Sequence, residues 1–186
     1  MTLLIAGLVL WSVVHFVPSI GISLKRQIID LFGEKIYLAL FAVLIISSLV
    51  LIVLGWRSTV PTPVYAAPVI NPSFSLVLMV LAFLLFGAAK YETRIKGVIR
   101  HPQLTSVIVW ATAHLLLNGD SRSVVLFGWM GCWAVLEIFM INRREGKWIK
   151  PEPPGWKKEV RGGAISLAIF VVVILLHPYI AGVPVR

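Results

Sequence analysis

Long apolar segments recur along this chain from residue 2 to residue 183, and the charged side chains fall mainly between them. About 20 apolar residues in an α-helix cross a hydrocarbon layer of about 30 Å, because each residue rises about 1.5 Å. The segments that reach or approach this length are Thr2–Pro18, Glu34–Trp56, Asn71–Ala89, Pro102–Asn118, Ser123–Ile141 and Ala164–Ile180. The sequence therefore predicts an all-α integral membrane bundle of about six transmembrane helices.

The composition agrees with a single membrane domain over residues 1–186. Of the 186 residues, 59% are hydrophobic and 13% are charged, and no part of the chain has the composition of a soluble domain. The amphipathic stretch Leu24–Phe32 is expected to lie at the membrane surface. Proline-rich sequence predicts irregular loops at Arg57–Pro72 and Lys150–Gly163.

Small residues in the fifth apolar segment predict close helix packing there. Gly128 and Gly131 are three residues apart, so they share one face of a helix. The first apolar segment has no basic residue before it, since the first one is Lys25, and it is therefore expected to be a retained span.

The basic residues predict the orientation of the chain. Fourteen of the 17 Lys and Arg residues lie in the loops after the first, third and fifth apolar segments; the others are Arg57, Arg122 and Arg186. Because positively charged loops stay in the cytoplasm, both termini are expected on the periplasmic side of a cell inner membrane. The formal net charge of +9 is then interpreted as a topology signal, and no nucleic-acid partner is expected.

Ionisable side chains inside apolar segments are the candidates for function, because hydrocarbon disfavours them. These are His15, His114, Glu137 and His177, and His101 lies where the fourth segment begins. A neutral imidazole that hydrogen-bonds between helices is the structural alternative for any one histidine. Four histidines in so small a chain favour a site.

The fourth apolar segment carries a polar face. Gln103, Val107, Trp110, His114 and Asn118 follow the spacing of one helix face, which we expect to point inward. Trp110 lies one turn before His114, where it can pack against a flat ligand or serve the core. The preceding His101 is expected near the N-cap, because Pro102 suits the first helical position.

Several motifs resemble one membrane protein family. They are Ile99-Arg-His-Pro-Gln103, Val109-Trp-Ala-Thr-Ala-His-Leu115, Asn118-Gly-Asp120 and the early His15-Phe-Val-Pro-Ser19. Together they resemble the NnrU family, which is similar to the 15-cis-ζ-carotene isomerases and takes its name from an association with nitrite and nitric oxide reduction. The resemblance covers nearly the whole chain.

The resemblance implies haem b as the cofactor. The two axial histidines of the isomerase branch match His15 and His114, and a further family histidine matches His101. With the residues of the polar face added, the expected cofactor-binding residues are His15, His101, Gln103, Trp110, His114 and Asn118. If the protein is an enzyme, the resemblance implies cis–trans isomerisation of a hydrophobic polyene such as a carotenoid. A role in nitrogen-oxide metabolism (denitrification), with nitric oxide as the ligand, is the other implied function.

Predicted depth in the membrane gives a different pairing of the histidines. The first segment runs inward, so His15 lies near its cytoplasmic end, whereas His114 lies roughly 18 Å from the cytoplasmic start of the fourth segment. Depth alone therefore pairs His15 with His101 and His114 with His177. His101 and His177 stay open as alternative ligands.

A second resemblance concerns the residues around Arg100. Arg100-His-Pro-Gln103, Asn118 and Arg143-Arg-Glu145 are similar to a part of isoprenylcysteine carboxyl methyltransferase-like membrane enzymes, which use S-adenosylmethionine. The sequence departs from that pattern, because Leu104 replaces a tyrosine and Glu145 stands without a second acidic residue. The methyltransferase is therefore the alternative function.

Overall fold

The computed structural model describes residues 1–68 and 72–182. Within these ranges the chain forms seven α-helices and one 3-10 helix, and its β-structure is limited to one isolated bridge between Pro63 and Asp120. In chain order the elements are α1 (Thr2–Ser19), α2 (Ile22–Phe32), α3 (Glu34–Ser58), α4 (Pro72–Ala88), η1 (Arg94–Gly97), α5 (Pro102–Leu117), α6 (Ser121–Glu145) and α7 (Trp156–Ala181). The all-α prediction is confirmed.

Each predicted apolar segment coincides with a helix, and α2 occupies the predicted amphipathic stretch. Asn71, the predicted start of the third segment, lies outside the described residues. Four helices, α1, α3, α6 and α7, are long and apolar enough to span a membrane. The other two, α4 and α5, have 17 and 16 residues. Their length of about 25 Å is less than the usual hydrocarbon thickness, so the count of six spans stays a prediction.

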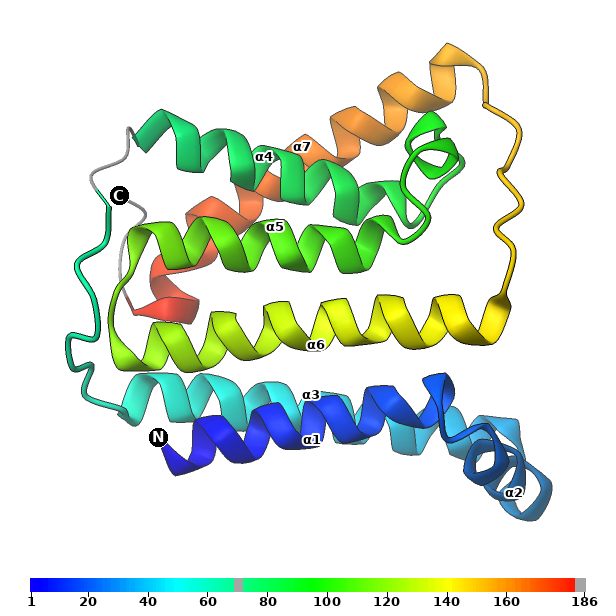
Figure 1. Ribbon diagram of the computed structural model, residues 1–186, viewed down its shortest axis with the longest axis horizontal. Helices are drawn as coiled ribbons and strands as arrows, with labels where there is room; N and C mark the ends of the chain where they lie inside the picture. The colour runs from blue at the N-terminus through cyan, green and yellow to red at the C-terminus, as the bar shows by residue number, and fades with distance from the viewer. Residues whose placement is uncertain (69–71, 183–186) are drawn as a thin grey trace. The chain divides into compact units, whose positions relative to one another are not determined.

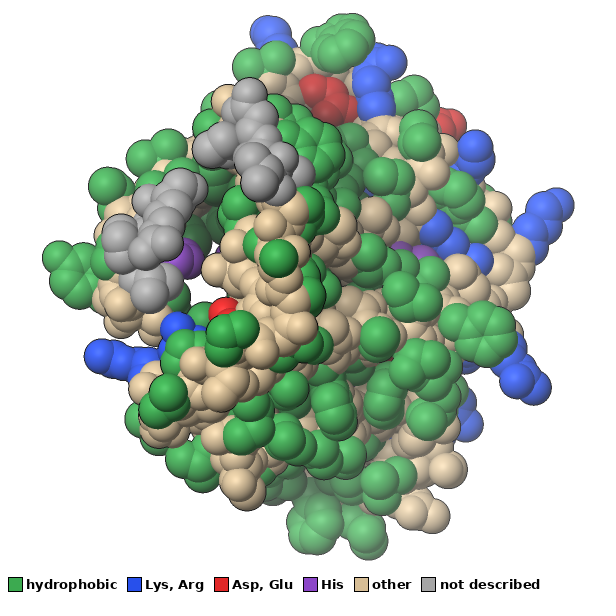
Figure 2. All heavy atoms as spheres, turned by 60° about the vertical axis from the view of Figure 1, so that its left-hand side comes forward, with side chains coloured by type: hydrophobic (Ala, Val, Ile, Leu, Met, Phe, Trp, Pro, Cys, Tyr) green, Lys and Arg blue, Asp and Glu red, His purple; other side chains and the backbone are tan. Residues whose placement is uncertain are grey.

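The long helices expose large apolar surfaces of the kind that contact lipid. In α3 and α7, 17% and 11% of the most apolar stretch is buried within the protein. Hydrophobic side chains cover much of the surface in view (Figure 2). An aqueous environment would strongly disfavour so much exposed apolar surface. The protein is therefore an integral membrane protein.

The chain divides into two compact units, Met1–Pro61 and Thr62–Arg186. In the first unit α1 packs along α3, and α2 contacts both. A Cβ added to Gly7 would lie 2.8 Å from the backbone nitrogen of Ile52, and one added to Gly55 would overlap the backbone of Leu4. Leu4 is fully buried. Glycines thus allow the two helices to approach closely.

In the second unit α5 lies between α4 and α6, and α7 crosses α4 (Figure 1). Phe83 of α4 and Phe170 of α7 pack with their ring centroids 5.1 Å apart.

The predicted close packing at Gly128 was wrong, because a Cβ there would meet open space. At Gly131 a Cβ would make an ordinary contact, 3.6 Å from Ala111.

Polar side chains hold the ends of the helices in the second unit. The Asp120 carboxylate caps α6 by accepting hydrogen bonds of 3.1 Å from the backbone N–H groups of Arg122 and Ser123. At the start of α7, Glu159 accepts hydrogen bonds from the buried Thr93 hydroxyl, at 2.9 Å, and from the Arg94 backbone N–H. The Asp120 contacts stabilise the first turn of α6, and the Glu159 contacts hold the start of α7 against the segment that precedes α5.

Candidate functional site

His114 lies in an aromatic cluster on α5 and α6. Its Nδ1 is 2.9 Å from the backbone carbonyl oxygen of Trp110, one turn earlier in α5. The imidazole stacks on the Phe127 ring of α6 with centroids 4.3 Å apart, and it is tilted against the Trp110 indole at 5.1 Å. The Trp110 and Phe127 rings also meet edge to face, at 4.8 Å. The imidazole is therefore held by two aromatic rings and one hydrogen bond.

The hydrogen bond to Trp110 decides the tautomer of His114. A backbone carbonyl accepts only, so Nδ1 of His114 carries the proton and Nε2 keeps its lone pair. Metal-binding histidines commonly donate one ring N–H to a carbonyl, which orients the other nitrogen toward the metal. The local geometry of His114 thus fits an axial ligand to haem iron.

His15 has the same local arrangement in the first unit. Its Nδ1 is 2.9 Å from the carbonyl oxygen of Trp11, one turn earlier in α1. The Trp11 and His15 rings lie 4.2 Å apart, and Phe41 of α3 meets His15 edge to face at 5.6 Å. Each unit therefore contains a tryptophan, a histidine four residues later, and a phenylalanine from a neighbouring helix.

The other predicted residues of α5 lie in different environments. Asn118 ends the helix, and its side-chain nitrogen donates to the His114 carbonyl oxygen at 2.9 Å. Gln103 is exposed, so the prediction that it faces inward was wrong. The buried positions are Pro102, Ser106, Ala111 and Ala113. Small residues occupy them because α5 is packed between two helices.

The two alternative ligands also differ in their surroundings. His101 is the N-cap residue of α5, as predicted, and its Nε2 lies 2.9 Å from the side-chain oxygen of Asn142. Binding of iron at that nitrogen would require this hydrogen bond to break. His177 is half-buried in α7 and belongs to the same unit as His114. No group of three or more His, Cys, Asp or Glu side chains placed to hold a metal ion occurs among the described residues.

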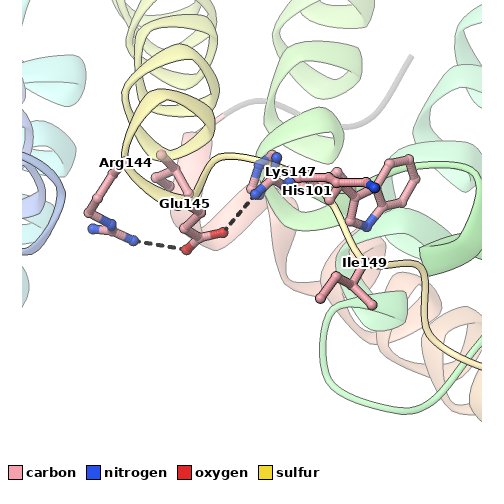
Figure 3. Close-up of a pocket in the computed structure, with 8 residues that line it drawn as sticks. His101, Arg144, Glu145, Lys147 and Ile149 are labelled. Atoms are coloured by element: carbon pink, nitrogen blue, oxygen red, sulfur yellow. Dashed lines mark hydrogen bonds and ion pairs between the residues drawn. The ribbon is translucent and has the colours of Figure 1, made fainter.

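A polar pocket of about 470 Å³ lies where α5 begins and α6 ends. Glu145 accepts hydrogen bonds from Arg100, at 3.2 Å, and from Arg144, at 3.0 Å. Arg100 also donates to the carbonyl oxygen of Gly146 at 2.8 Å. Figure 3 shows Glu145 beside Arg144, with Lys147 at the same pocket. The pocket brings together Arg100, His101 and Glu145, which belong to the methyltransferase resemblance, but not Gln103 or Asn118.

Sequence reasoning did not find Phe127, Phe41 or the pocket residue Lys147. The two phenylalanines come from neighbouring helices, and no local motif marks them. The sequence could have predicted a role for Trp11, because it precedes His15 by the same four residues that separate Trp110 from His114.

The fold and these sites define a class of protein. It is a polytopic helical membrane protein whose apolar helices carry histidines packed against aromatic side chains. The family model described as NnrU protein matches residues 3–185, nearly the whole chain. The chain therefore belongs to the NnrU family. Neither the search of curated proteins nor the search of solved structures finds a match to it.

Proposed function

We propose that this NnrU-family membrane protein binds haem b, with His114 as one axial ligand. The observation that carries the proposal is the hydrogen bond from Nδ1 of His114 to the Trp110 carbonyl, which leaves the lone pair on Nε2. The stacked Phe127 ring limits rotation of the imidazole. Apolar and aromatic surroundings also suit a porphyrin, and burial is one of the factors by which a protein tunes haem iron.

The second ligand is the less constrained part of the proposal. The family resemblance gives His15, whose Nδ1 is hydrogen-bonded to the Trp11 carbonyl in the same way. His177 is the alternative, because it belongs to the same unit as His114. His101 ranks third, since its Nε2 is hydrogen-bonded to Asn142.

For the activity, we propose cis–trans isomerisation of a hydrophobic polyene first and nitrogen-oxide metabolism second. Bound haem would supply an iron that can coordinate an unsaturated substrate or nitric oxide once one of the two histidine ligands is released. The chain's own contribution is to orient the imidazoles and to exclude water with Trp110 and Phe127. Both substrates can reach such a site from the hydrocarbon phase, which the exposed apolar helices contact.

A visible absorption spectrum of the detergent-purified protein, made in cells with ample haem, tests the proposal. Two histidine ligands should give a six-coordinate, low-spin spectrum with a Soret band. A protein that carries no haem under these conditions would contradict the proposal. Its histidines would then be hydrogen-bonding groups within the membrane. If haem is present, two additions distinguish the activities. Nitric oxide should shift the haem spectrum, and a cis-polyene should be converted to its isomerised product.

We also propose that the protein lies in the inner membrane with its basic loops in the cytoplasm. The support is the distribution of Lys and Arg, fourteen of which fall in alternate loops. In this orientation the pocket at Arg100 faces the cytoplasm, and His114 lies toward the periplasmic end of α5.

A further inference from the structure

The pocket between the start of α5 and the end of α6 has an excess of positive charge. Arg100, Arg144 and Lys147 line it, with Glu145 as the one carboxylate of the lining. Both Glu145 oxygens are already engaged, one by Arg100 and the other by Arg144. Lys147 has no ion-pair partner among the described residues. The pocket therefore has unmatched positive charge that an anion can neutralise.

The loop that carries Lys147 is held in place by backbone geometry and by Arg100. Gly146 ends α6 with a φ of 66°, a left-handed conformation that favours glycine, and its carbonyl oxygen accepts from Arg100 at 2.8 Å. Arg100 has only 17% of its side chain exposed, while its contact with the exposed Gly146 lies at the surface. Lys147 thus directly follows a turn that a hydrogen bond from Arg100 holds, and Arg144 lies in the last turn of α6.

Apart from His101, the remaining lining is apolar and typical of a membrane interface. Ile141 and Ile149 contribute alkyl surface, and Ile149 is 87% exposed. Trp148 adds an indole, with the Lys150 ammonium 5.2 Å from its ring centroid. Tryptophan and lysine are enriched at the level of lipid headgroups. The pocket therefore offers cations to a phosphate and, next to them, hydrocarbon surface to an acyl chain.

We propose that this pocket binds a phosphate group, and that its ligand is the headgroup of an anionic phospholipid. Arg144 and Lys147 bind the phosphate oxygens, while Ile141 and Ile149 contact the lipid chains. Basic pockets between membrane helices on the cytoplasmic side are suited to anionic headgroups. S-adenosylmethionine fits less well, because it carries a net positive charge and the pocket has no unengaged carboxylate for it. A soluble phosphate compound shares the headgroup chemistry and is the other source to be distinguished.

Native mass spectrometry of the full chain in neutral detergent tests the proposal. Phosphatidylglycerol and phosphatidylcholine with identical acyl chains are titrated separately, and one tightly retained phosphatidylglycerol is expected. Lys147→Gln should weaken its binding about fivefold, since each basic residue near an anionic lipid contributes about that factor. The double variant Arg144→Gln/Lys147→Gln should weaken binding further. Lys157→Gln, which removes one charge from α7 outside this pocket, is the matched control and should leave binding unchanged.

Equal retention of the two lipids, or equal effects of Lys147→Gln and Lys157→Gln, would overturn the proposal. Displacement of phosphatidylglycerol by millimolar inorganic phosphate would assign the site to a soluble phosphate compound. No displacement, with the charge dependence intact, would assign it to the lipid. The result is independent of haem, because none of these variants alters His15, His114 or His177.

Discussion

Trp110 and His114 are joined twice, through the hydrogen bond from Nδ1 to the carbonyl oxygen at 2.9 Å and through ring contact at 5.1 Å. The first contact uses the backbone of Trp110, so it is kept when the side chain changes. The second depends on the indole. The histidine can therefore be tested separately from its aromatic neighbour.

His114→Ala is expected to remove one iron ligand, and with it most of the haem or the low-spin state. Trp110→Phe is the matched control, because it retains the carbonyl, and it should leave the low-spin spectrum in place. His177→Ala should have the smaller effect if His15 is the second ligand. Haem content and the visible spectrum measure these effects. A spectrum that survives His114→Ala but not His101→Ala or His177→Ala would show that the pairing with His15 is wrong.

Reporter fusions test the orientation. A reporter that is active only in the periplasm should work when it is fused after Arg186, whose own placement lies outside the described residues. A reporter that folds in the cytoplasm should work when inserted in the loop before α7, near Gly155. With the N-terminus in the periplasm, cytoplasmic activity of the fusion after Arg186 would require an odd number of spans, and one of the two short helices, α4 or α5, would then not cross.

No binding of S-adenosylmethionine is expected in isothermal calorimetry of the purified protein. The reason is electrostatic, because Glu145 is already paired with Arg100 and Arg144, and a cationic ligand would meet the unpaired Lys147. Glu145→Gln should not create binding either. Saturable heat in the micromolar range, lost in the Arg100→Ala variant, would instead support the methyltransferase.

Gly55→Ala is expected to destabilise the first unit, whereas Gly128→Ala should not. A Cβ at position 55 would overlap the backbone of Leu4, and separating α1 from α3 to relieve it costs about 1–3 kcal/mol. At position 128 the same methyl group meets open space, and alanine favours the helix by up to about 1 kcal/mol. Thermal unfolding in detergent compares the two variants. Equal melting temperatures would argue against close packing of α1 on α3.

The Lys158–Glu92 pair, at 2.5 Å, is expected to make the second unit sensitive to acid. The hydrogen bond and the charge of Lys158 hold the pKa of Glu92 below its ordinary value of 4.5. A carboxylate whose pKa is lower in the folded state stabilises the fold at pH values above its ordinary pKa. This stabilisation is lost as the pH falls through the pKa of the folded state. Because both side chains are mostly exposed, the effect should be small and reduced by salt.

Unfolding measured between pH 7 and pH 3 checks this expectation. Lys158→Gln should reduce the loss of stability on acidification, and the neighbouring Lys157→Gln should leave it as in the parent protein. The same pH dependence in both variants would mean that other carboxylates cause it.

The sequence by itself determined the class of protein and the positions of its helices. A bilayer requires backbone polar groups to bond within the segment, so apolar runs of this length form helices with little dependence on their neighbours. Local chemistry also placed the start of α5 correctly, with His101 as N-cap and Pro102 in the first turn. The motifs around His101 and His114 pointed to the NnrU family, and the family match agrees.

Only the tertiary structure decided which residues lie next to each other across helices. The helix face that carries Gln103 and His114 was expected to point inward over its whole length, but Gln103 is exposed. The residues that α5 buries are Pro102, Ser106, Ala111 and Ala113. Small residues are buried there because α4 and α6 approach α5 on both sides, and hydropathy carries no information on such neighbours. The contact of Phe127 with His114, and the gathering of Arg100, Glu145 and Lys147 at one pocket, likewise depend on helix packing and on the turn at Gly146.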